Sequence, residues 1–514
     1  MKMLNKFAPL VIVFVTVLVY CKSFSGVFIF DDYIWIVDNE NIKSFWGSIL
    51  YSSRPLIGLT FYVNYLLGGL KAADYHAVNL LIHLASILLL FGILRRTFVL
   101  PMFRDTVGLS ATLFAGIISL FWGIHPIQTE SVTYIVQRSE SLMGMFYLLT
   151  LYCFIRGLMP QSDDNRWFFW GIISCALGML CKPVMVTAPL IVLLYDGTFL
   201  SGSVRLAIER HRKEYLLLAA TLLIPAILLS APNESSSSAG FGAIAVSPCQ
   251  YFITQSGVLL HYVKLVLWPM SLCLDYDWIP ANLSLKTIME ICVIVLAVVM
   301  SFRMFFKQQI VGFIGLSFFI MLFPSSGFIP LSDCAAEHRM YLPSVCVVLL
   351  FFFGTFRFMQ FVLRKDHLLP GVMLILGVVV CVCLGFMTVA RNRTYLSEEH
   401  MWNDVISKCP WNLRGRLGVG TVLLKQGNYE WAEYHFMKIV EDPRGAYQNL
   451  RYRYGTEFAM AYNNLGAIAF ERKQINKAKE LFEKSILFGK TSNAENNLRL
   501  VSEWQKMQNL DNKK

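Results

Sequence analysis

The sequence predicts an all-α polytopic membrane protein of about 11 transmembrane helices, followed by a C-terminal α-helical domain of tetratricopeptide repeats. Of its 514 residues, 56% are hydrophobic and only 15% are charged, which is too apolar for a soluble protein. Apolar runs of about 15–20 residues recur from Phe7 to Ala390, and each is long enough, or nearly so, to cross a bilayer. Beyond Arg391 the chain is polar and has no such run. We therefore divide it into a membrane domain, residues 1–390, and a repeat domain, residues 391–514.

Each apolar run is interpreted as one membrane span. The first run has the length of a secretory signal's apolar core, but Tyr20-Cys21-Lys22 is a poor cleavage site, so we expect the span to be retained. The predicted spans are residues 7–24, 76–94, 107–124, 141–157, 167–181, 184–200, 214–231, 286–304, 309–323, 344–361 and 368–390.

The basic residues indicate the orientation of these spans. Much of the net charge of +11 lies in alternate loops, for example at Lys2, at Lys6 and in residues 205–213, as is typical of cytoplasmic loops. An odd number of spans then places the repeat domain outside. Counting residues 250–268 as a span would invert every later loop. We therefore interpret this segment as a helix along the outer interface or entering it partway.

The C-terminal domain contains an internal repeat near residues 413–444 and 459–490. Residues 418–440 align with residues 464–486, and small and apolar positions match, such as Gly420 with Gly466. Small residues at these positions let two helices cross closely, as in tetratricopeptide helix pairs. Two repeats are fewer than a free-standing solenoid usually needs, so we expect them to pack against the membrane domain or a partner.

The predicted outer loops hold most of the unusual polar residues. Asp31 and Asp32 follow the first span directly. Adjacent carboxylates raise each other's pKa, and such a group can act as a general base that takes a proton from an acceptor hydroxyl. A solvated acidic pair without chemistry is the alternative.

Two further sets of polar residues lie in or near the outer loops. Glu130 and Arg138 are about two helical turns apart, so we expect them on one face of an interfacial helix, in a loop that also holds His125 and Glu140. Three polar residues share one face of the second span: His76, Asn79 and His83. They either hydrogen-bond to one another or line a contact between helices, and binding of a metal is the less favoured alternative.

Cations in the outer loops suit a phosphate. Lys182 can hold a lipid-linked phosphate as a point charge or simply extend to the interface, and Arg339 can make bidentate contacts. Acids for base chemistry and cations for a phosphate, all on one side, suit the transfer of a group from a lipid phosphate. Transport suits the pattern less, because the predicted mid-membrane positions are nearly free of charge.

The order of these motifs resembles that of the transmembrane and tetratricopeptide-repeat O-mannosyltransferases and their bacterial relatives. The motifs are FDD (30–32), SRPL (53–56), HPIQTE (125–130), Lys-Pro (182–183), EHRMYLPS (337–344) and the C-terminal repeats. The resemblance covers nearly the whole chain. It implies a GT-C glycosyltransferase fold with its active site outside. It also implies a polyprenyl-phosphate-linked sugar as donor, and a protein hydroxyl or a glycan as acceptor, with inversion at the anomeric carbon.

The resemblance also assigns roles. Asp31 or Asp32 would be the general base and Glu130 a second acid near the acceptor, while the repeats would present the acceptor. The leaving lipid phosphate would be held by Arg138, Lys182 and Arg339. The other active-site candidates are Arg54, His76, Asn79, His125, Glu140, Glu337, His338 and Tyr341. No cofactor is expected, a divalent metal is not favoured, and no nucleic-acid partner is expected.

Two departures from the animal members favour a bacterial relative. The chain has two repeats rather than a long array, and His338 stands between Glu337 and Arg339, where those members carry the Arg directly after the Glu. We therefore expect a multi-pass protein of the bacterial cytoplasmic (inner) membrane, with a cytoplasmic N-terminus and periplasmic repeats. The alternatives are a non-enzymatic tetratricopeptide scaffold, a transporter of lipid-linked glycans and a GT-C enzyme that has lost activity.

Overall fold

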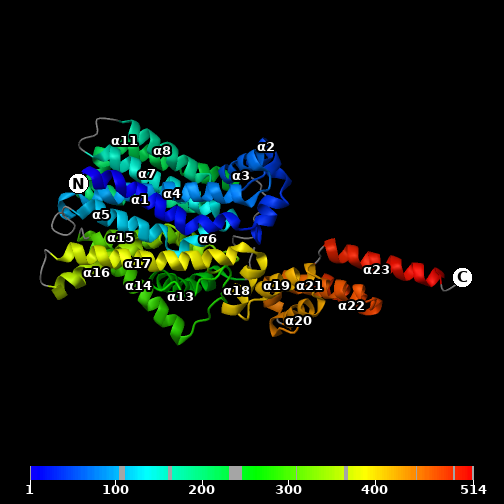
Figure 1. Ribbon diagram of the computed structural model, residues 1–514. Coiled ribbons are helices and arrows are strands. Elements are labelled where there is room, and N and C mark those ends of the chain that lie inside the picture. The colour runs from blue at the N-terminus through cyan, green and yellow to red at the C-terminus, as the bar shows by residue number, and fades with distance from the viewer. Residues whose placement is uncertain are drawn as a thin grey trace.

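The computed structural model describes residues 2–103, 110–159, 165–230, 246–307, 310–363, 368–446, 448–489 and 492–511. Helices form all the regular secondary structure in these ranges, which confirms the all-α prediction. Figure 1 shows a bundle of helices, with a second group of helices extending from one of its ends.

A helix lies in each of the eleven predicted span ranges. The helices are α1 (Lys2–Tyr20), α4 (Ala72–Phe98), α5 (Ala111–Gly123), α7 (Arg138–Leu158), α8 (Arg166–Met179), α9 (Ala188–Phe199), α11 with α12 (Arg212–Ala220, Leu223–Ser230), α14 (Leu285–Phe306), α15 (Ile310–Ser326), α16 (Ser344–Leu363) and α17 (Leu369–Asn392). In the described part of the chain, six helices are long and apolar enough to cross a membrane, or up to eight if two bent pairs each count once. Several spans are therefore confirmed, while their number stays a prediction.

The bundle packs around α4. This helix contacts α1, α5 and α7 and buries more than half of its residues. Trp122 on α5 lies fully buried and donates its Nε1–H to the Tyr341 carbonyl at 2.8 Å, which ties α5 to the segment before α16. By contrast α14 is almost wholly exposed and apolar, as expected of a helix that faces lipid.

Ten of the short helices between the spans gather at the end of the bundle that carries the second group of helices (Figure 1). They are η1 (Cys21–Ser25), η2 (Tyr33–Val37), η3 (Glu40–Lys43), α2 (Phe45–Leu50), α3 (Pro55–Gly68), η6 (Pro126–Gln128), α6 (Thr129–Val132), η7 (Ile135–Gln137), η8 (Pro183–Thr187) and η10 (Glu337–Met340). The expectation that Glu130 and Arg138 share one interfacial helix is wrong, because the chain bends between α6 and α7 through the separate turn η7.

The ambiguous segment forms α13 (Pro248–Leu267). Its hydrogen bonds connect its start, middle and end to segments at this same end of the bundle. The Tyr251 hydroxyl donates to Ser325 O at 2.7 Å, the Tyr262 hydroxyl to Ala336 O at 2.9 Å, and Val266 O pairs with His125 Nε2 at 2.9 Å. These contacts hold α13 against the segments at this end of the bundle, and the expectation that it does not cross the membrane stays a prediction.

The second group of helices follows α17. It comprises η11 (Arg393–Leu396), α18 (Glu398–Lys408), α19 (Leu413–Lys425), α20 (Tyr429–Val440), η12 (Pro443–Ala446), α21 (Gln448–Glu471), α22 (Ile475–Phe488) and α23 (Ser492–Asp511). The two predicted repeats coincide with the pairs α19–α20 and α21–α22. A Cβ added at Gly420 would lie 2.6 Å from the Phe436 ring, and one at Gly466 2.7 Å from the Phe482 ring. Both pairs thus cross closely at the same matched positions, while their assignment as tetratricopeptide repeats stays a prediction.

Candidate active site at one end of the helix bundle

Asp31 and Asp32 have different surroundings although they are adjacent. The Asp32 side chain is fully buried, and its two oxygens accept the backbone N–H groups of Ile29 at 3.0 Å and Val136 at 2.7 Å. Asp31 is half-buried, and its backbone N–H donates to the Tyr134 hydroxyl at 3.0 Å. Asp32 therefore fixes the loop, which leaves Asp31 as the better placed candidate for a base.

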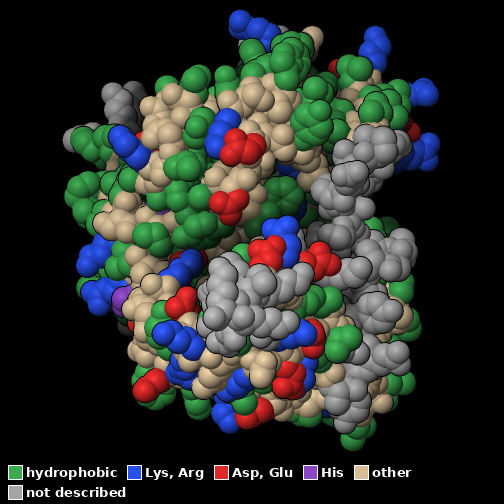
Figure 2. Space-filling view, turned by 90° about the vertical axis from the view of Figure 1, so that its right-hand side faces the viewer, with side chains coloured by type: hydrophobic (Ala, Val, Ile, Leu, Met, Phe, Trp, Pro, Cys, Tyr) green, Lys and Arg blue, Asp and Glu red, His purple; other side chains and the backbone are tan. Residues whose placement is uncertain are grey.

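The electrostatic surroundings of Asp31 suit that role. Burial raises the pKa of Asp31 to about 6, and the nearby Arg414 cation acts in the opposite direction. A base whose pKa lies slightly below neutral is ionised at neutral pH and can still accept a proton. Figure 2 looks on to this end of the molecule and shows basic and acidic side chains next to each other near its middle.

Two of the predicted cations lie beside Glu140, and one of them, Arg54, also lies near Asp31. Lys182, just before η8, forms an ion pair with Glu140 on α7, and their side chains are 13% and 2% exposed. Arg54, just before α3, donates from Nη1 to Ser139 Oγ at 3.0 Å. Its guanidinium also lies close enough to the carboxylates of Asp31 and Glu140 to interact with both electrostatically.

His338 on η10 lies among these charges. Lys182, Glu140, Arg339 and Arg54 all act on its imidazole, whose pKa is lowered well below the ordinary value by burial first and by Lys182 next. The ring is therefore neutral near pH 7, and its Nδ1 pairs with Glu130 Oε1 at 2.6 Å. The structure thus brings Asp31, Arg54, Glu130, Glu140, Lys182, His338 and Arg339 into one cluster.

Backbone carbonyls fix the orientation of Arg339. Its Nη1 donates to Cys334 O at 3.1 Å and its Nη2 to Asp333 O at 2.5 Å, and only 8% of the residue is exposed. A guanidinium held in this way keeps its charge at a fixed place, which is what pre-organised stabilisation of a phosphate requires.

The structure places Arg138 outside this cluster. It is fully buried and donates from Nε to Asn79 Oδ1 at 2.6 Å, from Nη1 to Asn64 Oδ1 at 2.7 Å and from Nη2 to Tyr75 O at 3.0 Å, with its guanidinium over the Phe61 ring. Its donors are committed to α3 and α4. We therefore assign Arg138 and Asn79 to holding these helices together rather than to a phosphate.

The remaining candidates make structural contacts around the cluster, and Glu337 lies close enough to Glu130 for their charges to interact. Tyr341 is buried and its hydroxyl pairs with His83 Nδ1 at 2.9 Å, so both belong to the bundle core. His125 accepts the Ile127 N–H at 3.2 Å through Nδ1 and so caps η6. Glu337 Oε1 accepts the Tyr276 hydroxyl and the Cys273 N–H, both at 2.5 Å. His76 is buried against Gly26.

Sequence reasoning missed the residues that join the second group of helices to the cluster. Arg414 on α19 donates to Asp275 Oδ2 at 2.9 Å and to Asp333 Oδ1 at 3.3 Å, and it lies over the Phe30 ring beside Asp31. In the sequence, Arg414 looks like an ordinary surface residue of a repeat helix, and its acidic partners lie far away along the chain. Among the described residues, no three His, Cys, Asp or Glu side chains are arranged to hold a metal ion.

Comparison with known proteins supports the resemblance seen in the motifs. Protein O-mannosyl-transferase TMTC4 of Mus musculus is 28% identical over 492 residues, which cover 82% of this chain and 64% of that protein. Protein O-mannosyl-transferase TMTC1 of Homo sapiens is 25% identical over 518 residues, which cover 88% and 55%. The predicted resemblance to this family is confirmed, and the chain spans less than two thirds of the length of either relative. No protein-family model matches the chain.

A solved structure is also similar in part. ArnT from Cupriavidus metallidurans, bound to undecaprenyl phosphate, is 12% identical, with a TM-score of 0.36 over 96% of this chain and 76% of that chain.

Proposed function

We propose that this chain is an integral-membrane glycosyltransferase. It moves a sugar from a polyprenyl-phosphate donor to a protein hydroxyl or a glycan acceptor on the outer side of the membrane. The observation that carries the proposal is the cluster itself, in which the half-buried acid Asp31 lies near Arg54, and Arg54 lies with Lys182 and Arg339 around His338. The relatives that share most of this sequence are named protein O-mannosyl-transferases, which agrees with the reaction type.

The reaction requires a base on one side of the anomeric carbon and positive charge on the other. Asp31 takes the proton from the acceptor hydroxyl as its oxygen attacks the anomeric carbon, and the bond to the lipid phosphate breaks with inversion. The phosphate leaves as an anion, and the cations stabilise the charge that develops on it.

The neighbouring acids have supporting roles in this proposal. Glu140 holds the Lys182 ammonium in the cluster, and Glu130 holds His338 through both its imidazole and its backbone N–H. Asp32 is a positioning residue, because both of its carboxylate oxygens already accept hydrogen bonds from backbone N–H groups. Glu130 therefore fixes η10, and with it the neighbouring Arg339, instead of touching the acceptor.

The test compares glycans on surface proteins and polysaccharides by mass spectrometry. We expect loss of one glycan in cells carrying Asp31→Asn or Arg339→Ala at matched membrane expression. Asp38→Asn is the matched control, because Asp38 lies in the same loop and is exposed. The glycan lost identifies the sugar and the acceptor.

A scaffold gives a different result. If the glycans persist in Asp31→Asn and Arg339→Ala while deletion of residues 400–514 alone produces a phenotype, the transferase proposal is wrong and the repeats act by recruiting partners. Purified protein and a synthetic polyprenyl-phosphate sugar then distinguish loss of catalysis from loss of an acceptor, because donor hydrolysis to water needs no acceptor.

A further inference from the structure

Two cysteines from distant parts of the chain meet where the second group of helices joins the bundle. Cys273 lies in the loop between α13 and α14, and Cys409 immediately follows α18. Both are buried, with 0% and 5% of the residue exposed, and both line the same hollow of about 600 Å³.

Hydrogen bonds on either side hold the two segments together. The Lys408 Nζ donates to Leu272 O at 2.6 Å, and the Asn412 Nδ2 donates to Asp275 O at 2.9 Å. Each thiol is thus next to a residue that is already bonded to the other segment. The positions of the thiols are fixed by these contacts and not by chance approach of two mobile loops.

The chemistry of the two thiols differs in the way that thiol–disulfide exchange requires. The hydrogen bond with Cys273 lowers the pKa of the Cys409 thiol, and the same contact raises that of Cys273. Cys409 is therefore the sulfur that ionises first and attacks first.

We propose that Cys273 and Cys409 form a disulfide that fastens the repeat domain to the membrane domain. This proposal depends on the outward orientation of this end of the bundle that the proposed function includes, because such a disulfide persists only in an oxidising compartment. The oxidant is the disulfide of a protein or small-molecule dithiol oxidant. The Cys409 thiolate attacks it and releases one thiol, and the Cys273 thiolate then attacks Cys409 Sγ and releases the second thiol. Two protons and two electrons leave the cysteines.

The disulfide would hold the wall of the candidate site. The loop that carries Cys273 also carries Tyr276, which donates to Glu337, and Asp275, which accepts from Arg414. Because both cysteines are buried in the folded protein, the bond forms while α18 docks on this loop. Once formed, it keeps the helices that we expect to present the acceptor beside Asp31.

Differential alkylation of the full-length protein in membranes tests the bond. Free thiols are blocked in detergent under denaturing conditions with one maleimide, and the protein is then reduced and labelled with a heavier one. We expect peptides with Cys273 and Cys409 to carry the heavier label in the wild type, and Cys409 to carry the first label in Cys273→Ser. Reductant should lower the Tm of the wild type and leave that of the double Ser variant unchanged.

Two exposed cysteines serve as controls. Cys292 on α14 and Cys383 on α17 are exposed, so Cys292→Ser and Cys383→Ser should leave the labelling of Cys273 and Cys409 unchanged. The first label on both Cys273 and Cys409 in the wild type would overturn the proposal. That measurement needs neither transfer activity nor a folded variant, so its failure leaves the proposed reaction untouched.

Discussion

At the scale of single residues, the neighbours Asp31 and Asp32 should respond differently to the same change. Asp32→Asn replaces an oxygen that accepts a backbone N–H with an amide NH₂, which leaves a buried donor without an acceptor. We expect a loss of about 1–3 kcal/mol of stability, seen as a lower Tm in detergent. Asp31→Asn should leave Tm nearly unchanged and abolish transfer. Equal loss of Tm in both variants would contradict this separation of roles.

The pH dependence of transfer reports on Asp31. Its folded-state pKa is raised to about 6, so the carboxylate that acts as base is lost as the pH falls through that value. We expect kcat/KM to fall on the acidic side of about pH 6 and to level off above it. The measurement is a rate profile between about pH 5 and about pH 8 with an acceptor that does not titrate in that range.

Arg414 should shift this profile. Its cation opposes the rise in the pKa of Asp31, so Arg414→Gln should move the acidic limb to higher pH, while Arg414→Lys keeps it near its original place. If the role of Arg414 is purely structural, Arg414→Gln lowers Tm but leaves the pH at which kcat/KM falls unchanged. An unchanged pH profile in Arg414→Gln would therefore contradict the electrostatic role.

The sequence was enough to find the polar candidates, but not to separate residues of the site from residues that only stabilise the fold. Arg138, Lys182 and Arg339 were all predicted to hold the phosphate. Arg138, however, is surrounded by Asn64, Asn79 and Tyr75. These acceptors lie about 60 or more residues away along the chain, so their approach to Arg138 follows from how α3 and α4 pack against α7. Burial, which no local pattern shows, decided between ligand and structural residue.

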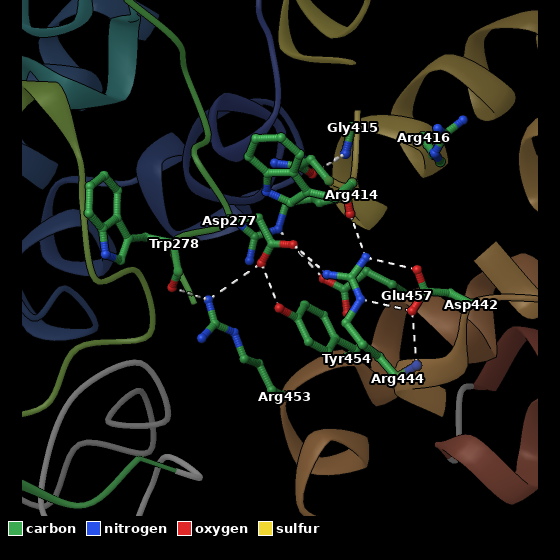
Figure 3. A network of polar contacts seen from close by, with 12 residues as sticks. Asp277, Trp278, Arg414, Gly415, Arg416, Asp442, Arg444, Arg453, Tyr454 and Glu457 are labelled. Atoms are coloured by element: carbon green, nitrogen blue, oxygen red, sulfur yellow. Dashed lines mark hydrogen bonds and ion pairs between the residues drawn. The ribbon is translucent and has the colours of Figure 1, made fainter. Parts of the chain in front are cut away.

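At the scale of elements, an ion-pair hub at Asp277 holds the second group of helices on the loop before α14. Figure 3 shows its carboxylate between Arg444 at 3.0 Å, Arg453 at 3.4 Å and the Tyr454 hydroxyl at 2.8 Å. Asp277 has a φ of +44°, a conformation that Asn also tolerates, so Asp277→Asn removes the charge without changing the backbone preference.

We expect Asp277→Asn to loosen that docking. A charge buried against two guanidinium groups is costly to remove, because Arg453 loses its carboxylate partner and Arg444 is left with Asp442. Hydrogen exchange should become faster in η12, α21 and the loop before α14, while exchange in α4 stays the same. Glu433→Gln is the control, since Glu433 pairs with Arg472 within the repeats. Unchanged exchange in the loop would show that other contacts hold the domain.

The two repeats were predictable as elements, but their docking was not. Matched small and aromatic positions fixed both helix pairs because their contacts are local. The contacts of Arg414 and Arg444 with Asp275 and Asp277 join segments more than 100 residues apart, and charged residues on a repeat helix are ordinarily solvated. Only the assembled fold shows which of them are half-buried partners.

At the scale of the whole molecule, the loops alternate between the two ends of the bundle. The candidate site and the second group of helices lie at one end, and the N-terminus lies at the other (Figure 1). This arrangement agrees with the predicted alternation of basic and non-basic loops.

Reporter fusions would establish the orientation and the crossing of α13 together. Alkaline phosphatase, which is active only outside the cytoplasm, should be active after Lys514 and within residues 279–283, and inactive after Gly202 and Lys307. If α13 crosses the membrane, the fusions at residues 279–283 and after Lys514 become inactive and the one after Lys307 becomes active, because every later loop is inverted. Inversion of all four reporters would instead place the candidate site in the cytoplasm. That result would exclude an outer-side transfer and, with it, the proposed disulfide.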